Sequence, residues 1–414
     1  MYKASFTDLA HLLGPQRLHE LRPMLEQVLK GKRLHHLTGP QPHKGTEELI
    51  TRLMALGEQI GFEVTWDRLW ADAGFEQACD VLSQESLNEQ FMWSQRLKQA
   101  YEEGLDYAKK QLRRHLWNAD AVFVHDIPAL PVVAERGAGC WAYFSYDYIG
   151  WTPRVFYESH IALLKKFDAV ILPNAAFTAP ELPPQHLWLP AVDVLAPRNR
   201  ELEDDEAQRL WQGLALPKDL TYILYADRYD RLDHAEELLG HYLGHKAHER
   251  VALVIAGEAA ETNPAARRHF AALRDRAKAD PSVHVLALPA NEALLNVLRR
   301  RSVAQLYWPR PGRTDPSLTE ALWAGSPVIA MDTLGVRDIV RSGVTAWLAT
   351  DALHMLDLAQ QLVQEKKRAL GLSERARMYA WDYLLLDNEL MNLACFFVFK
   401  QNPQTWVDWT AQYR

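Results

Sequence analysis

The chain has 414 residues, of which 48% are hydrophobic and 24% are charged. This length exceeds what a single hydrophobic core usually supports, so two or three globular domains are expected. The formal net charge of −7, without a dense basic stretch, argues against nucleic acid as a partner.

The cysteine spacing and the hydropathy pattern together indicate the cellular compartment in which the protein is expected. Its three cysteines are widely spaced and lack the spacing of metal ligands, which excludes a disulfide framework and favours a reducing compartment. No segment approaches the ~20 consecutive apolar residues that a membrane helix needs, and no signal-peptide pattern precedes the first charged residues. We therefore expect a cytoplasmic protein without a membrane span.

The first half of the chain alternates helical and strand patterns. Leucines spaced three and four apart predict helices up to about residue 32, and helical patterns also cover residues 46–60, 74–82 and 86–116. Strands are predicted at residues 34–38, 62–66, 121–126, 141–147 and 169–173. Strands that alternate with helices and end in polar residues indicate a parallel sheet covered on both faces.

A proline-rich passage separates this series from a second one. Prolines recur between residues 183 and 197, and the acidic run 201–206 follows them. Further strands are predicted at residues 221–225, 251–256, 283–286, 304–307 and 327–330, and the C-terminal residues are predicted to form long helices. We predict two doubly wound Rossmann-like domains that face a cleft, at residues 1–195 and 196–380, with helices in 381–414 returning to the first.

Residues 316–330 are the most informative segment. Pro316 presets the entry to a short helix that Ser317 or Thr319 could cap, and Gly325 ends the helix before an apolar strand. Glu320 is expected in the first turn, facing outward beside free backbone N–H groups. Such amides suit phosphate oxygens and such a carboxylate suits ribose hydroxyls, so the segment predicts a sugar-nucleotide site. The alternative is that Glu320 only supports its own helix.

The same run, Ser/Thr-Glu-Ala-Leu-Trp-x-Gly-x-Pro-Val, resembles the donor-site segment of retaining glycosyltransferases with the two-domain GT-B fold. Nearly the whole chain is similar to the trehalose glycosyltransferring synthases, a branch of the GT4 family. The segments that carry this resemblance are 39–48, 61–66, 124–128, 167–170, 189–202 and 227–230. The resemblance implies the GT-B fold and retaining transfer of glucose from a nucleoside diphosphate to a small sugar acceptor, without a metal ion or other cofactor.

The resemblance also assigns candidate site residues. The residues expected to serve catalysis and face the acceptor are His125, Asp126 and Asp147. The residues expected to bind the donor are Arg228, Arg231, Ser317, Leu318, Thr319 and Glu320. Three alternatives stay open: His125 could be satisfied within its turn, Asp147 could cap a helix, and Arg228 could form a surface salt bridge.

Two positions of the expected donor site depart from the family pattern. Gly312 stands where the family carries a Glu that holds hydroxyls of the donor sugar, and Asp233 stands where it carries a Lys of the phosphate clamp. Arg231, Arg310 or Arg313 could supply the missing positive charge. A second hypothesis is therefore a catalytically degenerate GT-B protein that binds a nucleotide, a sugar or a protein partner. The sequence leaves the oligomeric state open, and a homodimer is the assembly that we consider.

Overall fold

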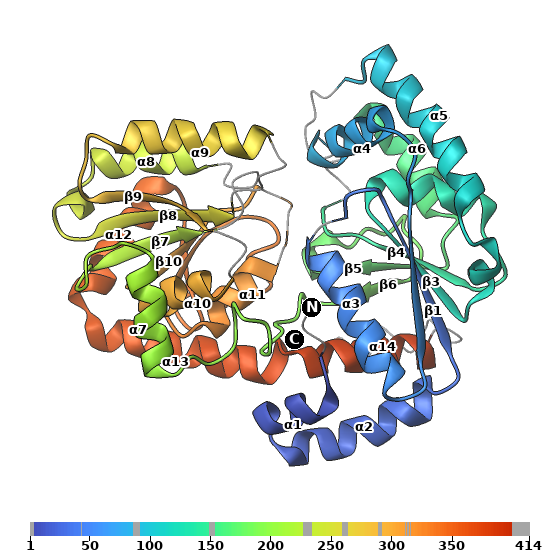
Figure 1. Ribbon diagram of the computed structural model, residues 1–414, viewed down its shortest axis with the longest axis horizontal. Helices are drawn as coiled ribbons and strands as arrows, with labels where there is room; N and C mark the ends of the chain where they lie inside the picture. The colour runs from blue at the N-terminus through green and yellow to red at the C-terminus, as the bar shows by residue number, and fades with distance from the viewer. Residues whose placement is uncertain are drawn as a thin grey trace. The chain divides into compact units, whose positions relative to one another are not determined.

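The computed structural model describes residues 4–42, 44–85, 92–148, 154–226, 234–258, 264–288, 292–310, 312, 314 and 316–399. The chain forms two compact units, Met1–Leu189 with Asp387–Arg414, and Pro190–Leu386 (Figure 1). These limits differ by a few residues from the domain limits expected at 195 and 380. Each unit is described by itself below.

The first unit contains a parallel sheet of six strands. The strands are β1 (Arg33–Thr38), β2 (Glu63–Arg68), β3 (Ala121–His125), β4 (Cys140–Phe144), β5 (Ala169–Leu172) and β6 (Gln185–Leu187). Their spatial order is β2-β1-β3-β4-β5-β6, so the direction of winding reverses between β1 and β3. Every residue of β3 is buried, which explains the apolar run from Ala121 to Val124 before His125.

Helices cover both faces of this sheet (Figure 1). They are α1 (Phe6–Leu13), α2 (Pro15–Leu29), α3 (Lys44–Glu58), α4 (Ala73–Glu85), α5 (Gln95–Gln111), α6 (Arg154–Leu164) and α14 (Leu386–Phe399), with 3₁₀ turns η1 (Arg114–Asn118), η2 (Ile127–Glu135) and η4 (Ala175–Phe177). The single helix predicted over 86–116 is wrong, because the hydroxyl of Ser94 accepts a bond from the N–H of Leu97 and α5 begins only at Gln95. Residues 86–91 lie outside the described part of the chain.

The C-terminal helix α14 belongs to the first unit and lies beside α3 in Figure 1. Arg52 of α3 pairs with Glu389 at 3.2 Å, and Arg17 of α2 pairs with Asp387. The ring of Phe396 packs edge-on against Phe123 of β3, with centroids 4.9 Å apart. Charged pairs near its start therefore fix this helix to α2 and α3, and an aromatic contact near its end fixes it to the sheet.

The second unit contains another parallel sheet of six strands. They are β7 (Tyr222–Ala226), β8 (Ala252–Glu258), β9 (Val283–Leu288), β10 (Ala304–Tyr307), β11 (Val328–Met331) and β12 (Trp347–Ala349), in the order β12-β11-β10-β7-β8-β9. Counted from β7, this is the 3-2-1-4-5-6 order of the Rossmann fold, with its reversal between β7 and β10. The prediction of two doubly wound sheets is confirmed. The three-residue strands β6 and β12 were not predicted.

Alternation along β7 explains why this sheet has two cores. Tyr222 and Leu224 point into a cluster that includes Trp211 of α7, whereas Ile223 and Tyr225 point into a larger cluster on the other face. The helices of this unit are α7 (Asp204–Gly213), α8 (Ala235–Leu243), α9 (Pro264–Ala277), α10 (Glu292–Arg301), α11 (Pro316–Trp323), α12 (Ala352–Gln364) and α13 (Lys366–Tyr383), with the 3₁₀ turn η5 (Lys246–Glu249).

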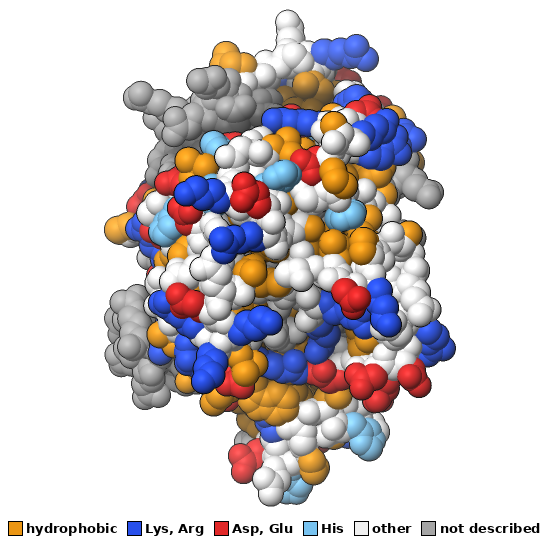
Figure 2. All heavy atoms as spheres, turned by 90° about the vertical axis from the view of Figure 1, so that its left-hand side faces the viewer, with side chains coloured by type: hydrophobic (Ala, Val, Ile, Leu, Met, Phe, Trp, Pro, Cys, Tyr) orange, Lys and Arg blue, Asp and Glu red, His pale blue; other side chains and the backbone are white. Residues whose placement is uncertain are grey.

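Surface charge and helix length agree with the composition. On the face drawn in Figure 2, Lys and Arg side chains are interspersed with Asp and Glu rather than gathered in one basic stripe. Within the described residues, every helix is too short or too polar to cross a bilayer.

Close packing between α4 and α5 generates a stability prediction. A Cβ atom on Gly104 of α5 would lie 2.5 Å from the Cβ of Phe75 in α4, whose side chain is fully buried. Gly104→Ala should lower the free energy of unfolding by about 1–3 kcal/mol, because the overlap outweighs the better helix propensity of alanine. The matched variant Gly213→Ala, where nothing lies within 4 Å, should not destabilise. Equal urea unfolding curves for Gly104→Ala and the parent chain would contradict this account.

Candidate functional site

Polar groups gather in the first unit where the winding of its sheet reverses. His125 is the last residue of β3, Asp126 follows it, and Tyr146 and Asp147 follow the neighbouring strand β4. Ligands of doubly wound sheets bind at the carboxyl ends of the strands beside such a reversal. This edge of the sheet is therefore the candidate acceptor site.

Two buried histidines are hydrogen-bonded to each other inside this edge. Nδ1 of His36 in β1 lies 2.8 Å from Nε2 of His125, and both side chains are fully buried. Burial lowers the pKa of His125 to about 3. Burial, together with the neighbouring His125 and His35, also lowers the pKa of His36 well below its usual range. Both rings are consequently neutral at physiological pH.

The predicted sugar-contacting residue His125 is enclosed by protein groups. Its Nδ1 lies 3.2 Å from the hydroxyl of Tyr146, so both of its ring nitrogens have protein partners. Its ring also stacks on Phe144 at 5.2 Å. His125 thus makes its hydrogen bonds within the protein, which is the alternative that the sequence left open. A direct role for His125 in catalysis stays a prediction.

Asp126 has an unusual backbone conformation. Its backbone angles, φ of 67° and ψ of 144°, lie in a region that residues other than glycine rarely adopt. Such a conformation costs about 1–3 kcal/mol, and strained residues of this kind concentrate at functional sites. The strain directs the chain from β3 into η2, whose first turn is closed by the N–H of Ala129 bonding to the carbonyl of Asp126 at 3.2 Å.

Asp147 is half-buried, and its backbone carbonyl accepts a hydrogen bond of 2.8 Å from the hydroxyl of Ser145. The helix α6 begins only at Arg154, well beyond it. Asp147 thus follows β4 at the same edge as Asp126, and its contact with an acceptor stays a prediction.

In the second unit, α11 begins at Pro316 and is followed by Gly325 with a φ of 84°. Pro316 and Gly325 act as predicted, but the proposed caps do not. Ser317 and Thr319 lie inside the helix, and the hydroxyl of Thr319 donates to the carbonyl of Pro316 at 3.0 Å. The N-terminal turn of α11 nevertheless has the backbone geometry that suits an anion site.

Glu320 does not face outward from the first turn, so that expectation is wrong. It lies in the second turn, and its side chain is only 6% exposed. Arg198 donates to one carboxylate oxygen at 2.6 Å, and Arg299 of α10 donates to the other at 2.8 Å. The amide of Asn199 adds a third bond at 3.2 Å. Although burial opposes it, the two guanidinium groups lower the pKa of Glu320 to about 2.

We call Glu320, Arg198, Asn199 and Arg299 the Glu320 cluster. The same segment is anchored further, because the indole N–H of Trp323 donates to the carbonyl of Asn199 at 2.8 Å. The sequence hypothesis missed Arg198 and Arg299 as partners of Glu320. One signal existed for Arg299: it lies in the short basic run 299–301, which the sequence predicts to end a helix.

Several predicted donor-site residues cannot be placed. Arg228, Arg231 and Asp233 lie outside the described residues, and so does Arg313. Gly312 is buried with a φ of 77°, and its N–H donates to the carbonyl of Leu334 at 3.3 Å. A glycine suits this left-handed conformation, whereas a glutamate there would be strained.

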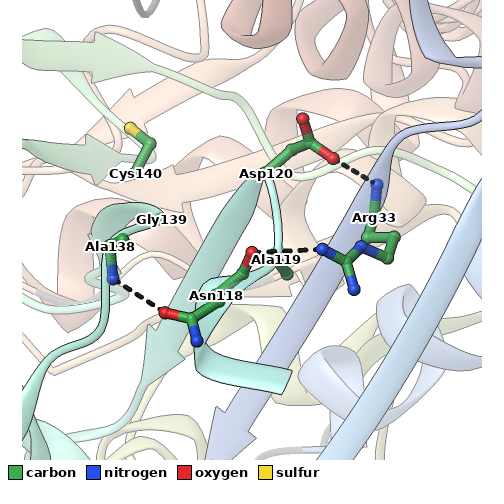
Figure 3. A pocket seen from close by; sticks show the side chains of 7 residues that line it. All are labelled: Arg33, Asn118, Ala119, Asp120, Ala138, Gly139 and Cys140. Carbon is green, nitrogen blue, oxygen red and sulfur yellow. Dashed lines mark hydrogen bonds between the residues drawn. The ribbon is translucent and has the colours of Figure 1, made fainter. Parts of the chain in front are cut away.

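A cavity of about 360 Å³ lies at the other edge of the first sheet (Figure 3). It is lined by Arg33, Asn118, Asp120 and Cys140, at the amino ends of β1, β3 and β4. The backbone N–H of Arg33 donates to Asp120 at 3.0 Å, and its guanidinium donates to the carbonyl of Asn118 at 3.3 Å. Because substrates of such sheets bind at the carboxyl ends, we assign no substrate to this cavity. Within the described residues, no group of three His, Cys, Asp or Glu side chains could hold a metal ion.

Comparison with known proteins defines the class. No protein-family model matches the chain. A solved sucrose-phosphate synthase from Thermosynechococcus elongatus superimposes with a TM-score of 0.67 at 14% identity, covering 88% of this chain and 98% of that one. The structure described as "Trehalose-6-phosphate from E. coli bound with UDP-2-fluoro glucose" gives a TM-score of 0.68 at 12% identity, covering 90% and 99%. The chain has the two-domain GT-B fold of these proteins.

Sequence similarity narrows the class further. A trehalose synthase from Pyrococcus horikoshii is 22% identical over 388 residues, which cover 91% of this chain and 92% of that protein. A trehalose synthase from Rubrobacter xylanophilus is 23% identical over 325 residues, covering 76% and 78%. The chain therefore has the GT-B fold and resembles the trehalose synthases over most of its length, as its motifs implied.

The Glu320 cluster predicts a structural effect that a ribose-binding role alone would not. Glu320→Gln removes the negative charge that faces the buried guanidinium of Arg299 at 2.8 Å, and it leaves Arg198 paired with Glu292 at 3.1 Å. We expect the free energy of unfolding to fall by about 3–5 kcal/mol in denaturant titration. Asp275→Asn, which removes an exposed partner of Lys278, should change little. Unchanged stability combined with lost nucleotide affinity would restore the ribose-binding role first expected.

The buried histidines predict a loss of stability in mild acid. Burial lowers the pKa of His125 and of His186 to about 3, whereas histidines of the unfolded chain take up a proton near pH 6.5. The unfolded state thus binds more protons below pH 6.5, and stability is lost as the pH falls from there towards 3. Each such histidine should contribute about 1.4 kcal/mol per pH unit in that window. His186→Leu should flatten the decline in urea unfolding between pH 6.5 and 5, and an unchanged slope would refute this.

Proposed function

We propose that the protein is a retaining glycosyltransferase that moves glucose from a nucleoside-diphosphate sugar to a small sugar acceptor. The nucleoside-diphosphate sugar is a substrate, and the proposed reaction requires no metal ion or other cofactor. The proposed location is the cytoplasm, and the proposed assembly is a homodimer.

Similarity over nine-tenths of the chain to a trehalose synthase is the observation that carries this proposal. Two features of the described residues support it. The first unit presents Asp126 and Asp147 at the carboxyl edge of its sheet, where hydroxyls of an acceptor would meet carboxylates. The second unit presents the N-terminus of α11, where backbone N–H groups suit the diphosphate of a donor.

The Glu320 cluster favours a second candidate function. Glu320 is already saturated by Arg198, Arg299 and Asn199, and Gly312 replaces the carboxylate that the family pattern expects. A site without both carboxylates could bind a nucleotide or a sugar without transferring glucose. The second candidate is thus a GT-B protein that serves as a binding subunit.

One experiment separates the two candidates. Nucleoside-diphosphate glucoses with different bases are first ranked by thermal shift, and the best donor is then incubated with glucose. A disaccharide whose donor anomer is retained, identified by nuclear magnetic resonance, supports the enzyme. Donor binding without any product, at enzyme concentrations that would reveal one turnover, supports the binding subunit. Absence of both binding and transfer refutes both candidates.

The position of Gly312 predicts how the rate responds to a restored carboxylate. Loss of one preorganised contact to the transition state commonly costs ~10²–10³ in rate, so we expect slow turnover in the parent chain. Gly312→Glu combined with Asp233→Lys should raise kcat by at least about tenfold, a part of that loss. Gly312→Ala with Asp233→Lys is the matched control, because it carries the same strain at a φ of 77° without the carboxylate. Equal rates in the two double variants would show that the carboxylate is irrelevant.

A further inference from the structure

Trp70 lies in the short connection between β2 and α4, and its side chain faces solvent. It is 60% exposed, the largest fraction for any tryptophan that the structure describes. A single exposed apolar side chain is common on protein surfaces and needs no functional explanation by itself. Two further features distinguish Trp70: the backbone on both sides of it is fixed, and it lies at the carboxyl edge of the first sheet.

The fold holds the backbone before and after Trp70. The N–H of Leu69 donates to the carbonyl of Thr38 at 2.9 Å, which extends the pairing of β2 with β1 by one residue. On the other side, the side chain of Asp72 accepts a bond of 2.8 Å from the first turn of α4. Leu69 and Ala71 are both buried, so the chain is anchored on either side of the exposed ring. The indole of Trp70 is therefore presented to solvent from a rigid support.

Strand register places Trp70 near the level of the candidate acceptor site. Leu37 of β1 pairs with Asp67 of β2 on one side and with Val124 of β3 on the other. Trp70 lies three residues beyond Asp67, and Asp126 lies two residues beyond Val124, so both follow the carboxyl ends of their strands. Because β1 alone separates β2 from β3, the two positions are about 10 Å apart across the sheet.

Charged groups accompany the aromatic side chains of this strand. Side chains alternate along a strand, so Trp66, Arg68 and Trp70 project from one face, where Arg68 pairs with Glu47 of α3 at 2.8 Å. The guanidinium of Arg68 also lies over the ring of Trp66, 4.0 Å from its centroid. Arg68 and Glu47 are 43% and 44% exposed, and a guanidinium has five N–H donors, more than one carboxylate can engage. A ligand on this face can therefore meet hydrogen-bonding groups as well as an aromatic ring.

An exposed aromatic ring beside charged hydrogen-bonding groups suits a sugar, because a pyranose packs its apolar C–H face on the ring and bonds through its hydroxyls. We propose that Trp70 forms a second sugar subsite, and that the acceptor is a sugar of at least two rings. One ring lies at Asp126 and Asp147, and the next ring stacks on Trp70. A spacing of about 10 Å across the sheet is too long for one pyranose and suits two joined rings. This inference rests on the proposed function and names the class of acceptor.

Sugar binding in the absence of a donor tests the subsite. Dissociation constants for glucose, maltose and cellobiose are measured by titration calorimetry or ligand-observed nuclear magnetic resonance. We expect the parent chain to bind the better disaccharide roughly five- to tenfold more tightly than glucose, because only a disaccharide reaches Trp70. Trp70→Ala should abolish this difference and leave the dissociation constant for glucose unchanged. Trp70→Phe, which keeps an aromatic ring, should retain most of the difference.

Tyr107→Ala is the matched control. Tyr107 is 48% exposed and belongs to the same unit, but it lies within α5 rather than at the end of a strand. Its removal should change neither the affinity for glucose nor the affinity for a disaccharide. The melting temperature of Trp70→Ala should equal that of the parent chain, since the ring that it loses is largely exposed. Equal affinities of the parent chain for glucose and both disaccharides would overturn the inference.

The outcomes separate this inference from the proposed function. Disaccharide binding that depends on Trp70 in a chain without transfer would sustain the subsite and refute the enzyme. Transfer to glucose, with disaccharide binding that is unaffected by Trp70→Ala, would sustain the enzyme and overturn the subsite. Intact disaccharide binding in Trp70→Ala, together with loss of self-association in sedimentation, would assign the ring to a contact between copies of the chain and also overturn the subsite.

Discussion

A carboxylate buried in protein must be matched by positive charge, and this constraint organises the second unit. Glu320 is held by Arg198 and Arg299, which lie 122 and 21 residues away in the chain. The pairing ties the segment that enters the unit to α10 and α11, the two helices beside the expected donor site. Such a cluster contributes little net free energy compared with apolar packing, but breaking it is costly, and it fixes which segments meet.

The same constraint changes how the family resemblance should be used. The chain resembles glycosyltransferases in the residues of the α11 segment, and Glu320 is the member of that segment with the strongest implied role. Its partners give it a structural role instead. A family motif can thus persist in sequence while arginines that contact one of its residues change the role of that residue. The chemistry therefore has to be inferred from the surroundings of each residue.

The parts of the fold that could be predicted were those with local patterns. Apolar runs such as β3 and β8 predicted strands buried on both faces, and Pro316 with Gly325 marked the limits of α11. Strands β6 and β12 have three residues each, too few for a periodic pattern. Partners distant in sequence were also inaccessible. The hydrogen bond between His36 and His125 joins residues that are 89 positions apart, so no local pattern in either segment predicts it.

The second unit is one continuous stretch of chain, from Pro190 to Leu386, and in the sequence it is inserted between the two segments of the first unit. During synthesis, which proceeds from the N-terminus, the ribosome completes the second unit before it makes α14. The first unit must therefore wait with its sheet partly uncovered, because Phe123 lacks Phe396 and Arg52 lacks Glu389 until the last helix emerges. The first unit therefore starts to fold before the second unit and can complete its core only after it. In that interval its uncovered strand face is an apolar surface that a chaperone could bind.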